Sequence, residues 1–155
     1  MTTQVTPALD AWVRLLRAHA TATRALSTRL VAEHGLTIND YEALLRLSRA
    51  DGERLRRVDL AETLLLTASG VTRLLDGLES SGLVERAACA SDRRVTYAVL
   101  TAAGRERLEA AAESHVGAVR ALFEDRFSDE EATQLAALLG RLPGTESADA
   151  EECTP

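Results

Sequence analysis

Arginine and hydroxyl side chains in the middle of the chain have the chemistry to bind a polyanion. Ser69, Thr72 and Arg73 lie close together in the sequence, and Arg93 and Arg94 follow further along. A guanidinium group donates paired hydrogen bonds to a phosphate, or to O6 and N7 of guanine. A hydroxyl group can donate to a phosphate, and threonine can touch the methyl group of thymine. These residue types indicate nucleic-acid recognition if the fold brings them to one surface.

The residues around Ser69 predict two short helices joined by a tight turn. The first covers 58–66, and the second begins after a cap at Thr67 or Ser69. The second helix has apolar residues at helical spacing: Val71, Leu74, Leu75 and Leu78. This arrangement is typical of a helix-turn-helix, in which the first turns of the second helix reach base edges in the major groove. Ser69, Thr72 and Arg73 occupy those turns.

A β-hairpin is predicted directly after this helix pair. The segments 83–86 and 95–100 are predicted strands, of which the second is rich in β-branched residues and alternates in polarity, and the polar turn 89–94 lies between them. A helix-turn-helix followed by such a hairpin is a winged helix.

Helices with apolar faces flank the predicted winged helix. One begins at Thr6-Pro7 and ends at Gly35, and another follows a cap at Thr37 or Asn39. Thr101 begins a helix to about 127, and a capping box at Ser128 begins the last helix, which stops at 143–144. A small winged helix cannot cover all these faces. We therefore expect a homodimer with twofold symmetry.

Composition limits the class of protein. The 155 residues are 46% hydrophobic and contain no apolar run long enough for a membrane span. The net charge is −6, but residues 54–105 carry eight arginines against six acids, a local charge of +2. The first residues do not resemble a secretory signal, and two cysteines are too few for a disulfide scaffold. A cytoplasmic location is the expectation.

The chain resembles the MarR family of bacterial transcriptional regulators over roughly residues 8–142. The similarity depends on Leu60-Ala61, on Ser69-Gly70-Val71-Thr72-Arg73-Leu74-Leu75-Asp76-Gly77-Leu78-Glu79, and on Gly82-Leu83-Val84-Glu85-Arg86. It also includes Asp92-x-Arg94 and Leu100-Thr101-x-x-Gly104. Each piece alone is weak, but the ordered set is specific.

The resemblance and the periodicity predict a mainly α fold with a small β-hairpin wing. Residues 1–36 are expected to form an N-terminal dimerisation helix, and 37–100 the winged helix-turn-helix. Residues 101–144 are expected to form C-terminal dimerisation helices, and 145–155 a disordered acidic tail.

The resemblance also implies roles for the hairpin tip. Arg94 is expected to enter a narrow minor groove, with Asp92 orienting its guanidinium group. Arg93 is expected to face phosphate. Arg86 either contacts phosphate or braces the wing through Asp92.

Regulators of this family often respond to small anionic or phenolic effectors. Trp12 and His19 are seven residues apart, as are Glu42 and Arg49, so each pair shares a helix face. Trp12, Glu42 and Arg49 resemble residues of the urate-responsive branch, which usually has Asp where this chain has Glu42. The alternative is structural, with Trp12 in an interface and the charged residues at the surface.

Other chemistries have weaker support. Cys89 lies near arginines that would favour its thiolate, so it is a candidate redox residue, although a lone cysteine is more often a small apolar residue. Cys153 falls in the predicted tail. The three histidines, His19, His34 and His115, are isolated, so no metal site and no cofactor are expected. No nucleophile, base and orienting group come together, so we do not expect an enzyme.

The sequence therefore predicts a homodimeric winged-helix repressor. It would bind a pseudo-palindromic double-stranded operator and be released by a small anionic or aromatic effector. The alternative is a winged-helix module that binds protein instead of DNA, which the overall negative charge favours.

Overall fold

The computed structural model describes residues 6–64 and 66–145. Cys153 and all of the predicted tail except Thr145 lie outside the described residues. The chain forms two compact units, one ending at His115 and the other beginning at Val116. No described helix is long and apolar enough to cross a membrane.

The first two helices begin and end where the sequence predicts. α1 (Pro7–His34) follows an N-cap at Thr6, and Gly35 ends it with φ at 68°, a conformation that glycine adopts without strain. α2 (Ile38–Arg49) is capped by Thr37 and not by Asn39. Thr37 Oγ1 accepts a hydrogen bond from the backbone N–H of Asp40, and the carboxylate of Asp40 accepts one from the backbone N–H of Thr37.

A strand that the sequence analysis missed follows α2. A short 3₁₀ turn (Asp51–Glu53) with positive φ at Gly52 and Glu53 leads into β1 (Arg54–Arg56). Three residues are too few to show an alternating pattern, so β1 could be recognised only from its pairing partner. The wing is consequently a three-stranded sheet and not a two-stranded hairpin.

The helix-turn-helix consists of α3 (Arg57–Thr63) and α4 (Ala68–Ser80). The predicted first helix, 58–66, begins one residue earlier in the structure and ends at Thr63. The apolar face of α4 is buried through Val71, Leu75 and Leu78. The opposite face of α4 is therefore left toward solvent.

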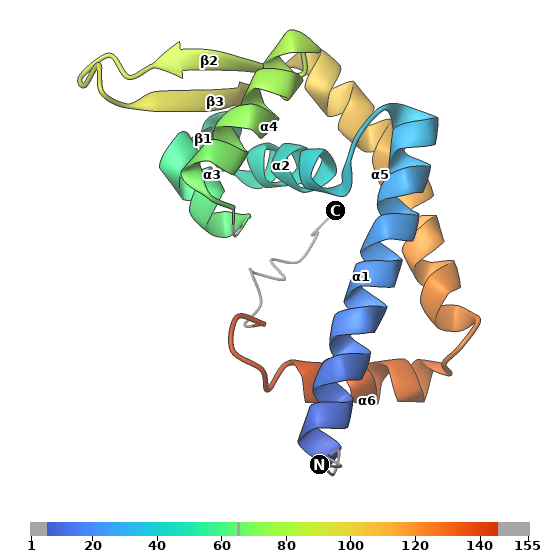
Figure 1. Cartoon of the computed structure of the whole chain (residues 1–155). Helices are drawn as coiled ribbons and strands as arrows, with labels where there is room; N and C mark the ends of the chain where they lie inside the picture. The colour runs from blue at the N-terminus through green and yellow to red at the C-terminus, as the bar shows by residue number, and fades with distance from the viewer. Residues whose placement is uncertain (1–5, 65, 146–155) are drawn as a thin grey trace. The chain divides into compact units, whose positions relative to one another are not determined.

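The antiparallel sheet has the strand order β1-β3-β2 (Figure 1). β2 (Val84–Ala88) pairs with β3 (Thr96–Leu100), and the register places Val84 opposite Leu100 and Arg86 opposite Ala98. β1 pairs with the other edge of β3. β3, the central strand, is thus hydrogen-bonded along both of its edges, which stabilises the base of the wing.

A tight corner joins the wing to α5 (Ala102–Glu124). The hydroxyl group of Thr101 donates to the Gly82 carbonyl at 2.7 Å and accepts from the Gly104 N–H at 3.0 Å. The predicted cap at Thr101 is thereby confirmed. The helix ends at Glu124, three residues before the predicted end.

The first unit has one apolar core. None of its described buried side chains is polar or charged. The largest fully buried side chains come from α1 to α4 and the first connection: Leu30, Leu36, Leu44, Leu47, Leu60 and Val71. Leu108 and Ala111 of α5 join them, so the N-terminal half of α5 packs in the same core as α1.

The second unit contains the end of α5 and α6 (Asp129–Leu139). Ser128 and Glu131 form the predicted capping box, with Ser128 Oγ accepting from the Glu131 N–H at 3.2 Å. α6 ends at Leu139, about three residues before the end predicted from the stop at 143–144.

Candidate nucleic-acid interface

The exposed face of α4 carries two of the three predicted base-reading residues. Thr67 Oγ1 accepts from the Gly70 N–H at 3.1 Å, so Thr67 caps α4, and the Ser69 side chain is left at the surface. Ser69 lies 3.2 Å from Thr67 between hydroxyl oxygens. Arg73 lies one turn further and is exposed. In the described part of the chain Arg73 has no ion-pair partner, so its guanidinium donors are available to an outside acceptor.

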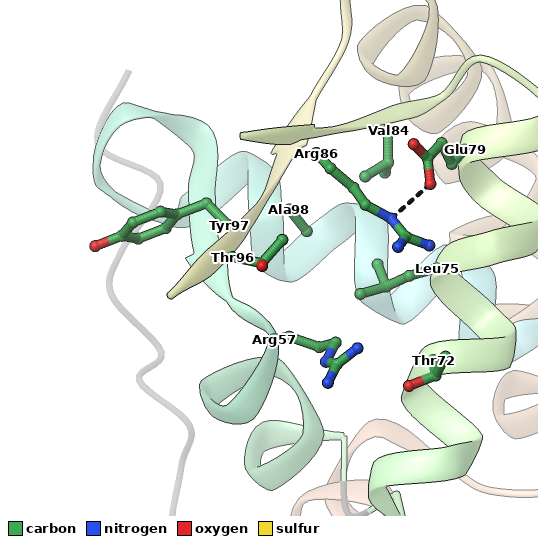
Figure 2. Close-up of a pocket in the computed structure, with 9 residues that line it drawn as sticks. All are labelled: Arg57, Thr72, Leu75, Glu79, Val84, Arg86, Thr96, Tyr97 and Ala98. Carbon is green, nitrogen blue, oxygen red and sulfur yellow. Dashed lines mark ion pairs between the residues drawn. The ribbon is translucent and has the colours of Figure 1, made fainter. Parts of the chain in front are cut away.

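Thr72 differs from its two neighbours. It is half-buried, and its hydroxyl group donates to the Ala68 carbonyl at 2.9 Å. Its side chain lines a small cavity between α4 and the wing (Figure 2). The expected donation from Thr72 to a phosphate therefore competes with a hydrogen bond inside its own helix.

The wing tip is a β-turn that presents two arginines. The Val95 N–H donates to the Asp92 carbonyl at 3.1 Å, which places Arg93 and Arg94 at the two central positions. Asp92 Oδ1 accepts from the backbone N–H of Arg94 at 2.9 Å. We expected Asp92 to pair with the Arg94 guanidinium group, but it orders the backbone of the turn instead. Both arginine side chains are exposed.

Arg86 pairs with α4 and not with Asp92. Its guanidinium group contacts Asp76 Oδ1 and, at 2.6 Å, Glu79 Oε2. Asp76 and Glu79 are three residues apart, so they share one face of α4. The suggested brace through Asp92 was wrong, because Asp92 lies in the tip turn while Arg86 lies in the middle of β2, beside α4.

A cavity of about 40 Å³ separates α4 from the wing beside this ion pair (Figure 2). Arg57, from the start of α3, lines it together with Thr72, Arg86 and Tyr97. The sequence predicted no role for Arg57, and it placed Asp76 and Glu79 in the family motif without a role of their own. The i, i+3 spacing of Asp76 and Glu79 shows in the sequence that the two acids share a helix face. Their pairing with Arg86 does not show there, because Arg86 lies on a strand ten residues after Asp76.

The four predicted effector residues do not form a described site. Trp12 and His19 are exposed on α1, and Arg49 is exposed on α2. Glu42 pairs with Arg46, with an N–O distance of 3.7 Å. None of the four lines the cavity beside the wing or the open hollow beside Gly35 and Leu83.

A different polar cluster lies between α2 and α5. The rings of Tyr41 and His115 have centroids 4.5 Å apart. Arg46 Nε and His115 Nδ1 are buried and have no hydrogen-bond partner in the described structure. Burial lowers the pKa of His115, and the nearby Glu42 opposes this shift. Burial likewise raises the pKa of the Tyr41 hydroxyl group.

Cys89 lies at the end of β2, where its sulfur is 3.2 Å from Ser91 Oγ. The hydrogen bond from the Ser91 hydroxyl group, followed by the backbone N–H groups of Ser91 and Asp92, lowers the pKa of the thiol. We expected arginines to have this effect, and the cause in the structure is hydrogen bonding.

Comparisons with known proteins agree with this geometry. Residues 34–95 match the model of the MarR family. The regulator PecS of Dickeya dadantii is 31% identical over 120 residues, which are 77% of this chain and 71% of PecS.

Two solved structures from Streptomyces coelicolor are similar over most of their length. AbsC, a MarR family transcriptional regulator, is 37% identical with a TM-score of 0.79, over 89% of this chain and 93% of AbsC. Sco3205, a MarR family regulator solved in complex with DNA, is 29% identical with a TM-score of 0.80, over 90% of this chain and 88% of Sco3205. Similarity of this extent in sequence and fold shows that the chain belongs to the MarR family of winged-helix DNA-binding transcriptional regulators.

Proposed function

We propose that the protein is a homodimeric repressor whose two α4 helices enter successive major grooves of a pseudo-palindromic operator. Ser69, Thr72 and Arg73 would read base edges or phosphates from α4. Arg94 would enter the minor groove at each flank, and Arg93 would contact phosphate. In this arrangement 37–100 is the DNA-binding region, and 1–36 and 101–144 form the dimer.

The observation that carries the proposal is the placement of unpaired arginines at two ends of one unit. Arg73 is exposed on α4, and Arg93 and Arg94 are exposed at the wing tip. None of the three has an acidic partner within 4.0 Å in the described residues. The same fold in Sco3205 is solved in complex with DNA, which supports this use of the surface.

Dimerisation is supported by an apolar stripe on α1. Its residues follow the spacing i, i+3, i+4, i+7, and each is between 41% and 58% exposed: Leu9, Trp12, Val13 and Leu16. A contiguous exposed apolar patch of this kind marks an interaction surface. A second copy of the same helix is the partner we propose, because a twofold axis covers two such stripes at once.

We also propose release by a small anionic or aromatic effector. Arg46 Nε and His115 Nδ1 are buried without hydrogen-bond partners in the described residues; His115 packs against Tyr41, and Arg46 pairs with Glu42 from the predicted set. Trp12, His19 and Arg49 stay candidates for the same ligand. An effector that binds better to a dimer with unsuitable spacing of the two α4 helices would weaken DNA affinity by population shift.

The test is a fluorescence-anisotropy titration with DNA from upstream of the protein's own gene and a scrambled fragment. We expect selective binding that weakens as salt rises. Arg73→Ala should weaken operator binding by about 1–3 kcal/mol, since a bidentate contact to guanine is lost. Arg94→Ala should reduce the preference for A·T-rich flanks.

Arg14→Ala is the matched control, because it removes the same charge from an exposed side chain on α1. It should change operator affinity far less than Arg73→Ala. Equal losses in the two variants would reject a specific role for Arg73. Equal weak binding of the wild type to both fragments would favour the protein-interaction alternative.

A further inference from the structure

The wing and α4 face each other across a small cavity. On this face of the sheet, Val84, its partner Leu100 and Ala98 are buried, as is Leu75 of α4. Arg86 is paired with Ala98 and lines the cavity of about 40 Å³ together with Val84 and Leu75. A space of this size can hold a water molecule, so the sheet and the helix are not fully packed against each other there.

A group of ion pairs joins the sheet to α4 beside this cavity. Arg86 reaches across from β2 to Asp76 and Glu79 on α4. Figure 2 shows its ion pair with Glu79. We call these three residues the Arg86 clamp. They are about half exposed, so each pair contributes modestly to folding stability. Their effect on the position of the wing is greater than their effect on stability, because these ion pairs join α4 to the wing in the described residues.

The negative charges of Asp76 and Glu79 oppose DNA binding by α4, the helix that carries them. Two carboxylates on α4 repel the phosphates of the DNA that this helix enters. If they had no other role, removing one of them would tighten binding. Their joint pairing with a single arginine indicates instead that they hold the wing.

We infer that Arg86 is a positioning residue, and that the Arg86 clamp sets the wing relative to α4 so that Arg73 and Arg94 reach the DNA together. This inference rests on the proposed interface of Arg73 and Arg94. It assigns Arg86 a role between two elements of the protein instead of a contact with phosphate.

The decisive variant is Glu79→Gln, because the two explanations predict opposite signs. Loss of a repelling charge alone tightens operator binding. Loss of the clamp weakens it, by about two- to fivefold for one half-exposed pair. Glu85→Gln is the matched control, since Glu85 also carries one exposed negative charge near the wing base and has no ion pair in the described residues. The control should leave binding unchanged or slightly tighter.

Arg86→Gln then separates positioning from phosphate contact. A lost phosphate contact lowers the slope of log affinity against log salt by about 0.9 per contact, and it weakens binding to every sequence. A lost clamp acts through the wing arginines, so Arg86→Gln weakens operator binding in the wild type but has little further effect in a variant that carries Arg93→Ala and Arg94→Ala. A direct phosphate contact by Arg86 is lost to the same extent in both backgrounds. Arg86→Lys keeps the positive charge but lacks the planar guanidinium group that can pair with both carboxylates at once. Its operator affinity should therefore lie between those of Arg86→Gln and the wild type.

A double variant completes the experiment. In the Arg86→Gln background, Glu79→Gln should have no further weakening effect, because the two residues act through one contact. Thermal unfolding of each variant checks that the fold is intact. Tighter binding by Glu79→Gln, or an equal loss from Arg86→Gln in the wild type and in the variant without the two wing arginines, would overturn the inference. If wild type fails to select the operator, or Arg73→Ala has no effect, the proposed interface itself has failed.

Discussion

Gly104 shows how one residue can carry both a family motif and a packing constraint. A methyl group added at this position would lie 2.1 Å from the Leu83 carbonyl oxygen and 2.8 Å from Leu100 Cδ1. Backbone cannot move aside as a flexible side chain can. The first turn of α5 therefore passes the base of the wing at a distance that only glycine allows, and Thr101 ties the same corner by hydrogen bonds.

Gly104→Ala should destabilise the protein strongly. Because the clash is with backbone, we expect a fall in the free energy of unfolding of about 1–3 kcal/mol or more. Gly77→Ala is the control, since a methyl group there meets nothing within 4 Å and α4 should gain about 0.5–1 kcal/mol. Urea denaturation at one protein concentration measures both. A neutral Gly104→Ala would show that the corner can relax.

At the scale of elements, the contact of α2 with α5 joins the DNA-binding region to a long flanking helix. Tyr41 of α2 packs against His115 of α5, and Arg46 lies on the same helix as Tyr41 with a buried Nε. A neutral imidazole suits this half-buried place, because burial disfavours the charged form. Protonation of His115 at low pH should therefore weaken the contact between Tyr41 and His115.

Stability should fall as pH drops through the usual titration range of histidine. The folded pKa of His115 lies below its ordinary value of 6.5, so the unfolded chain takes up a proton that the folded chain resists. The free energy of unfolding then decreases with falling pH, by at most about 1.4 kcal/mol per pH unit for one proton. Stability is regained as pH rises above 6.5.

His115→Gln should flatten this dependence between about pH 7 and about pH 5. Urea denaturation across that range gives the slope for the wild type and the variant. His19→Gln, which removes an exposed imidazole from α1, is the control. Equal slopes in wild type and His115→Gln would contradict the assignment.

For the whole molecule, the exposed stripe on α1 predicts that a charge there separates the subunits. Leu16 is 52% exposed in the single chain, and Leu16→Glu would put a carboxylate into the proposed interface. We expect monomers in sedimentation experiments, together with a large loss of operator affinity, because one α4 helix can then reach only one half-site. Ala18→Glu, on the other side of α1, should leave both properties intact. A dimeric Leu16→Glu protein with normal affinity would place the interface elsewhere.

Local sequence signals predicted most of the elements correctly. Caps at Thr6, Thr37, Thr67 and Ser128 act within three or four residues, so their hydrogen bonds follow from the sequence nearby. The winged helix, the exposed arginines and the family could be identified for the same reason. Helix ends were less predictable, since the last turns of α3, α5 and α6 depend on packing and not on a strong local stop signal.

Contacts between distant residues were decided only by the tertiary structure. β1 exists because β3 offers a free edge, and three residues alone carry no pattern. Asp92 orders a turn while Arg86 finds Asp76 and Glu79, because the register of the wing places Arg86 over α4. The sequence determined by itself which residues could bind DNA and which helices carry them. Only folding decided which partners those residues keep, because a guanidinium group pairs with whichever acid the packing of the core brings within reach.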